Sequence, residues 1–284
     1  MKENLITQSD FIPVIDAHCH IFPDAIAEKA MINVGRFYNL PMYTKGTLAE
    51  LYAVRSGVPE SDRRIVMQMI FSPATDPAQT KSINDFIAGI CSKDKSILGF
   101  GTLHRDNADY KEEIRRIKVL GLIGVKFHTD FQRFRLDDPA MLPIYREIAA
   151  NHMPVIFHMG DRKLEYSAVS GLKAVLEKVP ELTVIAAHMG GYLHWNEAYE
   201  SLPVRRNLYF DISSTLAFIS QEDLGRMLEK FGSTQFFFGS DFPMWNPNEE
   251  LSRLKKMNLS EDVRRGIEYQ NFLNFLDFLD RHSE

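Results

Sequence analysis

Short runs of β-branched and aromatic residues alternate with amphipathic stretches along this 284-residue chain. From the second run onward they begin roughly 25 to 32 residues apart, the length of one strand–loop–helix–loop module. The runs span residues 14–20, 64–71, 97–104, 121–128, 153–158, 182–188, 208–213 and 235–241. Helical patterns between them include Leu172, Val175, Leu176 and Val179, spaced i, i+3, i+4 and i+7. Eight such modules predict an α/β fold, either an open doubly wound sheet or a closed (β/α)8 barrel.

Polar residues at the ends of the runs favour one of these two architectures. The eighth run ends in Asp241, and five others end in His20, His104, His128, His158 and His188. A closed barrel gathers the C-terminal ends of all its strands around one site, whereas an open sheet spreads them along an edge. We therefore expect a single-domain (β/α)8 TIM barrel over residues 1–284. It should carry a helical insertion after the first strand and extra helices at the C-terminus.

Composition limits the partners and the compartment. Lys and Arg total 33 against 38 Asp and Glu, and this net charge of -5 argues against nucleic acid as the main partner. No apolar run reaches the roughly 18 residues of a membrane span, and the first residues have no signal-peptide core. Two cysteines cannot form a disulfide framework, which is typical of a reducing compartment. We expect a cytoplasmic protein with a small-molecule substrate, no nucleic acid or membrane partner, and possible assembly into a homodimer.

The segment VIDAHCHIF places two histidines on the first predicted strand. His18 and His20 are two residues apart and share a face, whereas Cys19 faces away toward the helical layer. Two imidazoles on one face at the end of an interior strand are a natural pair of metal ligands. A pair of hydrogen-bonded core histidines would give the same pattern, so this motif alone leaves both interpretations open.

Three later runs end in the same kind of residue. His158 in FHMG, His188 in AHMGG and Asp241 in GSDFP each stand at the C-terminal end of a predicted strand. Ala186 and Gly239 lie two residues before the last two, on the same faces, and leave room inside a barrel. Each residue alone is more often a core histidine or a helix-capping aspartate. Their shared position at one end of the strands favours a metal site.

These motifs resemble those of the amidohydrolase superfamily, in the amidohydrolase-related branch that contains both hydrolases and non-oxidative decarboxylases. The resemblance rests on IDAHCH, GVKFH, FHMG, AHMGG and GSDFPMW, and it covers nearly the whole chain. It implies that His18, His20, His158 and Asp241 bind one divalent metal ion. Zn²⁺ fits such ligands best, and Mn²⁺, Fe²⁺ or Ni²⁺ would also fit. The resemblance further implies that His188 is a general acid or base, a substrate contact, or in some relatives a metal ligand.

The same residues are compatible with two metal-dependent reactions. We expect first a hydrolase that uses metal-activated water on an amide, lactone or ester of a small organic acid, because hydrolysis requires nothing beyond that water. Asp241 would accept the proton of the water, and His188 would protonate the leaving group. The alternative is a decarboxylase of an aromatic or unsaturated carboxylic acid, in which one of these residues delivers the proton that replaces CO₂. A TatD-like nuclease also begins with an H-x-H strand, but the negative charge and the motifs GVKFH and GSDFP disfavour it.

Four further residues are candidates for binding a substrate that is itself a carboxylate. Lys126 and His128 share a face of the fourth strand, where Lys126 would hold the carboxylate as a cation. Two alternatives for Lys126 are pairing with an interior acid and, as in binuclear relatives, carboxylation that bridges two metals. His128 could equally make a structural hydrogen bond. Tyr192 and Trp245 follow AHMGG and GSDFPM on loops, where they would wall a pocket or pack within the loops.

Two regions outside the motifs bear on substrate access and assembly. The long connection over residues 21–63 contains helical patterns and could form a lid over the metal, or pack on a neighbouring subunit. Asp161 and Arg162 follow FHMG and either reach the mouth of the barrel or form an exposed turn of opposite charges. A C-terminal amphipathic helix is predicted to close the barrel, with a dimer contact as its alternative; its apolar residues are Phe272, Leu273, Leu276 and Leu279.

Overall fold

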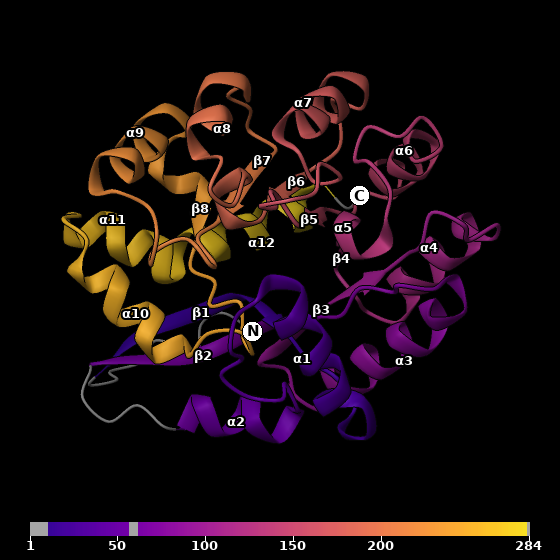
Figure 1. Ribbon diagram of the computed structural model, residues 1–284, viewed down its shortest axis with the longest axis horizontal. Coiled ribbons are helices and arrows are strands. Elements are labelled where there is room, and N and C mark those ends of the chain that lie inside the picture. Colours follow the sequence, from indigo (N-terminus) through magenta and orange to yellow (C-terminus); the bar gives the residue numbers. More distant parts are fainter. Residues whose placement is uncertain (1–10, 57–61, 283–284) are drawn as a thin grey trace.

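The computed structural model describes residues 11–56 and 62–282 as eight strands that alternate with helices. Each strand pairs in parallel with the next, in the order β1 to β8, and the helices lie outside the ring of strands (Figure 1). The strands are β1 (Ile12–His20), β2 (Arg63–Phe71), β3 (Ile97–Thr102), β4 (Gly124–Phe127), β5 (Val155–Phe157), β6 (Val184–Ala186), β7 (Leu208–Asp211) and β8 (Phe236–Phe237). The predicted (β/α)8 TIM barrel is confirmed.

The helices follow the amphipathic patterns between the strands. They are α1 (Asp24–Tyr38), α2 (Leu48–Ser56), α3 (Thr80–Cys91), α4 (Tyr110–Val119), α5 (Thr129–Gln132), α6 (Leu142–Ala150), α7 (Val169–Lys178), α8 (Trp195–Ser201), α9 (Gln221–Phe231), α10 (Pro247–Lys256), α11 (Glu261–Arg265) and α12 (Asn271–Arg281). Short 3₁₀ turns are η1 (Pro77–Gln79), η2 (His188–Gly190) and η3 (Ser233–Gln235), and η4 (Gly266–Gln270) is π-helical. None of the described helices has the length and apolar character that spanning a bilayer requires.

The last strand joins the first through the loop that follows it. Because β8 is only two residues long, backbone hydrogen bonds beyond its end complete the ring. The N–H of Asp241 donates to the carbonyl of His18 at 2.9 Å, and the N–H of His20 donates to the carbonyl of Phe242 at 2.6 Å. The closure of the barrel therefore places the Asp241 backbone directly beside the two histidines of β1.

Most of the observed strands are shorter than the predicted runs, so several polar residues lie just beyond them. His128 follows β4 and His158 follows β5, while His188 and Asp241 lie on loops after β6 and β8. His188 has a φ of 56° and Asp241 a φ of 62°, in the left-handed region. This conformation costs a non-glycine residue roughly 1–2 kcal/mol and cannot continue a strand ladder. The strands therefore stop before the residues that the pattern had included in them.

The N-terminal end of the barrel interior is filled by apolar side chains and covered by the C-terminal helix. Phe272 and Phe275 of α12 join the interior cluster that includes Tyr209 and Phe237. The rings of Phe237 and Phe272 have centroids 5.3 Å apart, and those of Tyr209 and Phe275 are 4.9 Å apart. Each buried aromatic side chain contributes about 1.5–3 kcal/mol. The prediction that this helix closes the barrel is confirmed, and the opposite end is left for the site.

The connection between β1 and β2 carries two helices, α1 and α2, where the sequence showed helical patterns. Helix α1 buries Ala27 and Met31 and ends at Asn39, whose φ of 55° gives a left-handed cap. Cys19, between the two histidines of β1, is buried in the layer between strands and helices, as its predicted outward orientation requires.

Gly239 is required by the close approach of the loop after β8 to β1. A Cβ at this position would lie 2.8 Å from His18 Cβ and 3.3 Å from Ser213 Cβ. We expect Gly239→Ala to lower the free energy of unfolding by about 1–3 kcal/mol, because His18 has no room to move. Gly225→Ala in α9 is the matched control: nothing lies within 4 Å of its Cβ, so it should raise stability by about 0.5–1 kcal/mol. Urea denaturation of the two variants measures both effects, and equal midpoints would contradict the steric argument.

Candidate metal centre

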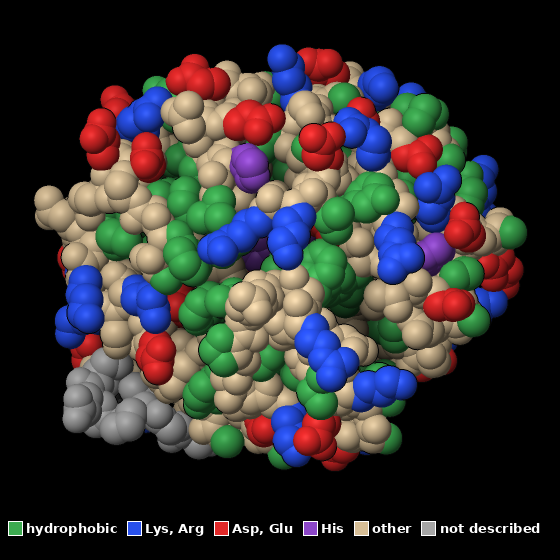
Figure 2. All heavy atoms as spheres, in the orientation of Figure 1, with side chains coloured by type: hydrophobic (Ala, Val, Ile, Leu, Met, Phe, Trp, Pro, Cys, Tyr) green, Lys and Arg blue, Asp and Glu red, His purple; other side chains and the backbone are tan. Residues whose placement is uncertain are grey.

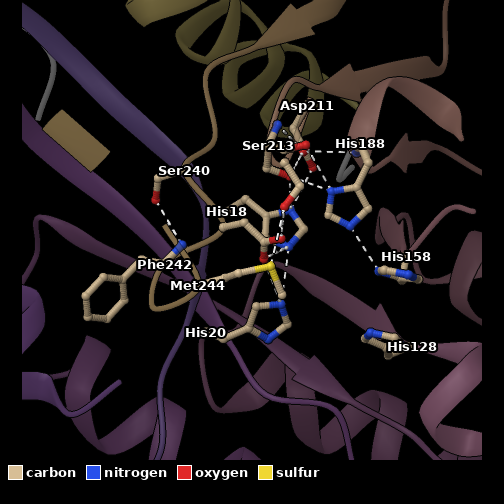
Figure 3. Close-up of polar contacts among 12 residues, drawn as sticks. His18, His20, His128, His158, His188, Asp211, Ser213, Ser240, Phe242 and Met244 are labelled. Carbon is tan, nitrogen blue, oxygen red and sulfur yellow. Dashed lines mark hydrogen bonds and ion pairs between the residues drawn. The ribbon is translucent and has the colours of Figure 1, made fainter. Parts of the chain in front are cut away.

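Three donor atoms from β1 and the loop after β8 converge at the C-terminal end of the barrel. His18 Nε2 and His20 Nε2 are 3.3 Å apart, and Asp241 Oδ1 lies 3.5 and 3.6 Å from them. A donor atom of His188 lies within 4.8 Å of donors of His18 and Asp241. Figure 3 shows the rings of His18, His20 and His188 around this common centre. The structure thus brings four of the predicted residues together, and their binding of a metal stays a prediction.

Asp211, the last residue of β7, fixes the orientation of His18. Its Oδ2 accepts a hydrogen bond from His18 Nδ1 at 2.9 Å, which directs Nε2 of the imidazole toward the centre. Its Oδ1 accepts from the backbone N–H of Ser213 at 3.1 Å and of His188 at 3.3 Å. Burial opposes ionisation, but the charge and hydrogen bond of His18 hold the pKa of Asp211 well below its usual range. Sequence reasoning did not select Asp211 for this role, although it ends a strand on the same side as the histidines.

His158 and His188 face each other with Nδ1 and Nε2 only 2.9 Å apart. The other nitrogen of His188 lies 3.1 Å from the carbonyl of Ser213, and the other nitrogen of His158 lies 3.1 Å from the carbonyl of Gly160. A carbonyl only accepts hydrogen bonds, so these outer nitrogens carry the protons and the inner nitrogens present lone pairs. Two lone pairs at this distance require a proton or a cation beside them. The donor set therefore fits a divalent cation.

Burial keeps four imidazoles that line the cavity in their neutral form. It lowers the pKa of His20, His128 and His158 well below the usual value, and it lowers that of His188 to about 4, against the opposing charge of Asp241. Neutral imidazole is the form that binds metal ions. Near pH 7 these side chains are therefore ready to act as ligands without losing a proton.

His158, predicted to share a metal with His18, His20 and Asp241, instead belongs to a second group of donors, with His128 and Asp130. The rings of His128 and His158 are stacked, with centroids 3.8 Å apart and planes 10° from parallel. Tyr38 of α1 places its hydroxyl 3.0 Å from His128 Nε2 and 3.4 Å from His158 Nε2. Burial raises the pKa of Asp130 to about 6, although Ser167 opposes the shift. No sequence motif singled out Tyr38 or Asp130; Tyr38 lies in the first connection, and Asp130 lies two residues after His128.

Lys126 lies beside the donor atom of His18 and does not line the cavity. Its Nζ is 3.5 Å from His18 Nε2 and 4.7 Å from the centroid of the Phe71 ring, and the side chain is fully buried. Burial lowers the pKa of Lys126 to about 8, against the opposing charges of Asp211 and Asp241. Within residues 11–56 and 62–282, no direct ion pair joins Lys126 to a carboxylate, and Asp211 and Asp241 act on it only through their charges.

A cavity of about 630 Å³ opens onto the donor cluster. It is lined by the histidines and Asp241 on one side and by aromatic side chains on the others: His20, His128, His158, His188, Phe22, Phe37, Tyr38, Phe131, Tyr192 and Trp245. Tyr192 and Trp245 therefore reach the pocket, as the sequence predicted, whereas Lys126 is not among the lining residues. Helix α1 forms much of the wall. In Figure 2, Lys and Arg side chains flank a partly hidden histidine near the centre of the face that is shown.

The loop after β5 does not form an exposed turn of opposite charges, so that alternative for Asp161 and Arg162 is wrong. Asp161 is buried, and its Oδ1 accepts from the N–H groups of Lys163 and Leu164 at 2.7 and 2.9 Å. Arg162 instead donates to the hydroxyl of Tyr192 at 3.3 Å. The loop carries its acid inward and its base toward the mouth of the barrel.

A family model described as Amidohydrolase matches residues 15–278, nearly the whole chain. The chain belongs to the amidohydrolase family. The resemblance carried by the sequence motifs is confirmed. No protein of curated function matches this amidohydrolase-family chain.

Solved structures share the fold of this amidohydrolase-family chain at low identity. A 5-carboxyvanillate decarboxylase from Sphingomonas paucimobilis is 16% identical, with a TM-score of 0.67 over 94% of this chain and 99% of that one. A dihydroxybenzoic acid decarboxylase from a Polaromonas species, with bound manganese and 2-nitroresorcinol, is 16% identical, with a TM-score of 0.68 over 94% and 97%. A candidate 2-pyrone-4,6-dicarboxylic acid hydrolase from Pseudomonas putida is 16% identical, with a TM-score of 0.65 over 94% and 98%.

Removal of a donor should abolish metal binding without unfolding the barrel. We expect His18→Ala and Asp241→Ala to lose nearly all metal on purification, since each removes one corner of the donor triangle. Elemental analysis by mass spectrometry gives the metal content, and circular dichroism checks the fold. His282→Ala, at the exposed end of α12, is the control and should keep the full content. Full metal in both site variants would contradict the assignment.

Asp211→Asn tests the orientation of His18 separately from ligation. The amide keeps the size of the carboxylate but removes its charge, so we expect metal affinity to fall about 10- to 100-fold. Competition with a fluorescent chelator measures this affinity. An unchanged affinity would show that the contact with Asp211 does not support the metal site.

Proposed function

We propose that the protein is a metal-dependent decarboxylase of a small aromatic or unsaturated carboxylic acid. The observation that carries this proposal is the cavity of about 630 Å³, whose aromatic walls end at neutral imidazoles and the carboxyl groups of Asp241 and Asp130. Flat apolar walls suit a planar substrate, and the donor cluster suits its polar end. The cation would be held by His18, His20 and Asp241, with His158 completing the set and His188 left free beside it.

A divalent cation bound there would withdraw electrons from substrate oxygen atoms and stabilise the negative charge that develops on them. The chain supplies the remaining requirements. Phe22, Phe37 and Phe131 would hold the ring of the substrate and exclude water, which strengthens every electrostatic interaction in the site. Exclusion of water also favours loss of CO₂, because the charge of a carboxylate is poorly stabilised in apolar surroundings.

The reaction requires one proton to replace the departing carboxyl group. The carbon–carbon bond breaks, its electron pair remains on the ring carbon, and a proton is delivered to that carbon as CO₂ leaves. Asp241 and His188 are the groups that both line the cavity and adjoin the donor cluster. Either can take up a proton from water and pass it to the carbon, His188 on the free lone pair of its Nε2, since its Nδ1 donates to the carbonyl of Ser213.

The solved structures with this fold support the choice of reaction. Two of those described above are decarboxylases of aromatic acids, and one of them holds manganese. Imidazole and carboxylate donors bind Mn²⁺ as well as the Zn²⁺ that the sequence favoured. We therefore propose Mn²⁺ first and Zn²⁺ second as the ion to supply.

Hydrolysis is the second candidate. Asp241 and His188 lie beside one another across the donor cluster, as a base for water and an acid for a leaving group must. The Pseudomonas putida structure, a candidate 2-pyrone-4,6-dicarboxylic acid hydrolase, has the same fold. The aromatic walls give no preference for an amide, lactone or ester over an acid, so decarboxylation stays first.

A product assay separates the two reactions. Protein loaded with Mn²⁺ or Zn²⁺ is incubated with a panel of hydroxybenzoic acids, unsaturated dicarboxylic acids and aryl lactones, and both CO₂ and new acid are measured. We expect CO₂ release in step with substrate loss, and His188→Asn should slow it by about 100-fold or more while metal content is kept. Substrate loss with acid formed and no CO₂ would overturn decarboxylation in favour of hydrolysis.

A further inference from the structure

A second, smaller cavity of about 190 Å³ adjoins the main one. Residues that line both cavities are Phe37, Tyr38, Leu40 and Tyr192. The remaining wall of the small cavity is the loop of residues 161–164, directly after the FHMG segment. Tyr38 and Tyr192 therefore lie on the boundary between the two cavities, and a ligand in the main cavity can reach this loop past them.

The exposed charges around both cavities have one sign. The charged residues that line them and are exposed are Lys29, Arg133, Arg162 and Lys163, all cationic. The chain as a whole carries a net charge of -5, so this arrangement departs from the average surface. None of the four forms an ion pair with another residue within the described ranges 11–56 and 62–282. Their charges are available to a ligand.

Arg162 is the cation with a fixed orientation. Its Nη2 donates to the hydroxyl of Tyr192 at 3.3 Å, and its guanidinium lies 5.8 Å from the centroid of that ring. These contacts engage one edge of the guanidinium, and no other side chain or carbonyl of residues 11–56 and 62–282 occupies its remaining N–H donors. A guanidinium held in this way is suited to bidentate binding of a carboxylate.

The acids that line the two cavities do not neutralise Arg162. Asp161 has Oδ1 engaged by the N–H groups of Lys163 and Leu164, which turns the carboxylate into its own loop. Asp130 and Asp241 are buried and belong to the donor groups of the site. No carboxylate of the described residues forms an ion pair with Arg162.

We propose that Arg162, supported by Lys163, binds a second carboxylate of the substrate. The substrate class would then be a dicarboxylic acid, with one carboxylate at the donor cluster and the other at the small cavity, across Tyr38 and Tyr192. This inference rests on the proposed function, because it assumes that the first carboxylate lies in the main cavity. It names Arg162 as the residue that makes the site prefer a dicarboxylic acid to a monocarboxylic acid.

Isothermal titration calorimetry of the Mn²⁺-loaded protein tests this assignment. The ligands are benzoate, which has one carboxylate, and three dicarboxylates in which the distance between the carboxylates increases: isophthalate, terephthalate and 4-carboxycinnamate. We expect at least one dicarboxylate to bind about tenfold or more tightly than benzoate. Arg162→Gln should lower that affinity about 10- to 100-fold and leave benzoate within about twofold. Arg206→Gln, an exposed arginine just before β7 at the opposite end of the barrel, is the matched control and should change neither. The double variant Arg162→Gln, Lys163→Gln shows whether Lys163 binds the carboxylate when Arg162 is removed.

Two outcomes would overturn the subsite and can be told apart from failure of the proposed function. If benzoate binds and no dicarboxylate binds more tightly, or if the double variant keeps the full preference for the dicarboxylate, the second site is wrong and the proposed function is untouched. If neither benzoate nor any dicarboxylate binds the metal-loaded protein, both proposals fail. An equal loss of affinity for benzoate and dicarboxylate in Arg162→Gln would also contradict a separate subsite.

Discussion

The hydrogen bond from the N–H of Asp241 to the carbonyl of His18 is the contact on which the site depends. It belongs to the closure between the first and last strands, which are more than 200 residues apart in the chain. This backbone bond brings the carboxylate of Asp241 beside the imidazoles of His18 and His20, and it does not depend on any contact between the side chains. The fold and the candidate metal centre are therefore one structural feature, since opening the barrel here would separate the donors.

Two buried carboxylates hold this junction in place. Asp16 accepts from the N–H of Ser240 at 2.9 Å and from its hydroxyl at 2.6 Å, which ties β1 to the loop after β8. Asp211 ties β7 to His18 and to the backbone of His188. An unpaired buried charge would cost several kcal/mol, and here each acid instead accepts several hydrogen bonds. The donors of the site are thus oriented by acids that do not face the cavity.

The parts of the fold and site that the sequence predicted are those encoded by local periodicity. Strand–helix alternation indicated the barrel, and the C-terminal positions of His18, His20, His188 and Asp241 indicated that they would meet. The sequence could not show that His188 and Asp241 adopt left-handed backbone, because that conformation arises from packing at the rim. It therefore placed them inside strands.

Residues that act through long-range contacts were the ones that local pattern did not identify. Asp211 supports His18 across 193 positions, and Tyr38 reaches His128 from a helix 90 positions away. Lys126 shows the opposite case. Its place on β4 suggested a contact with substrate, but it is fully buried beside His18 and Phe71 and does not line the cavity, so that contact stays a prediction.

Anomalous diffraction at the manganese edge, from crystals of protein loaded with Mn²⁺, tests the central claim most directly. The account predicts one peak bonded to His18 Nε2, His20 Nε2 and Asp241 Oδ1, at coordination distances of roughly 2 Å. A peak elsewhere, or no peak while these three side chains keep only protein partners, would contradict it.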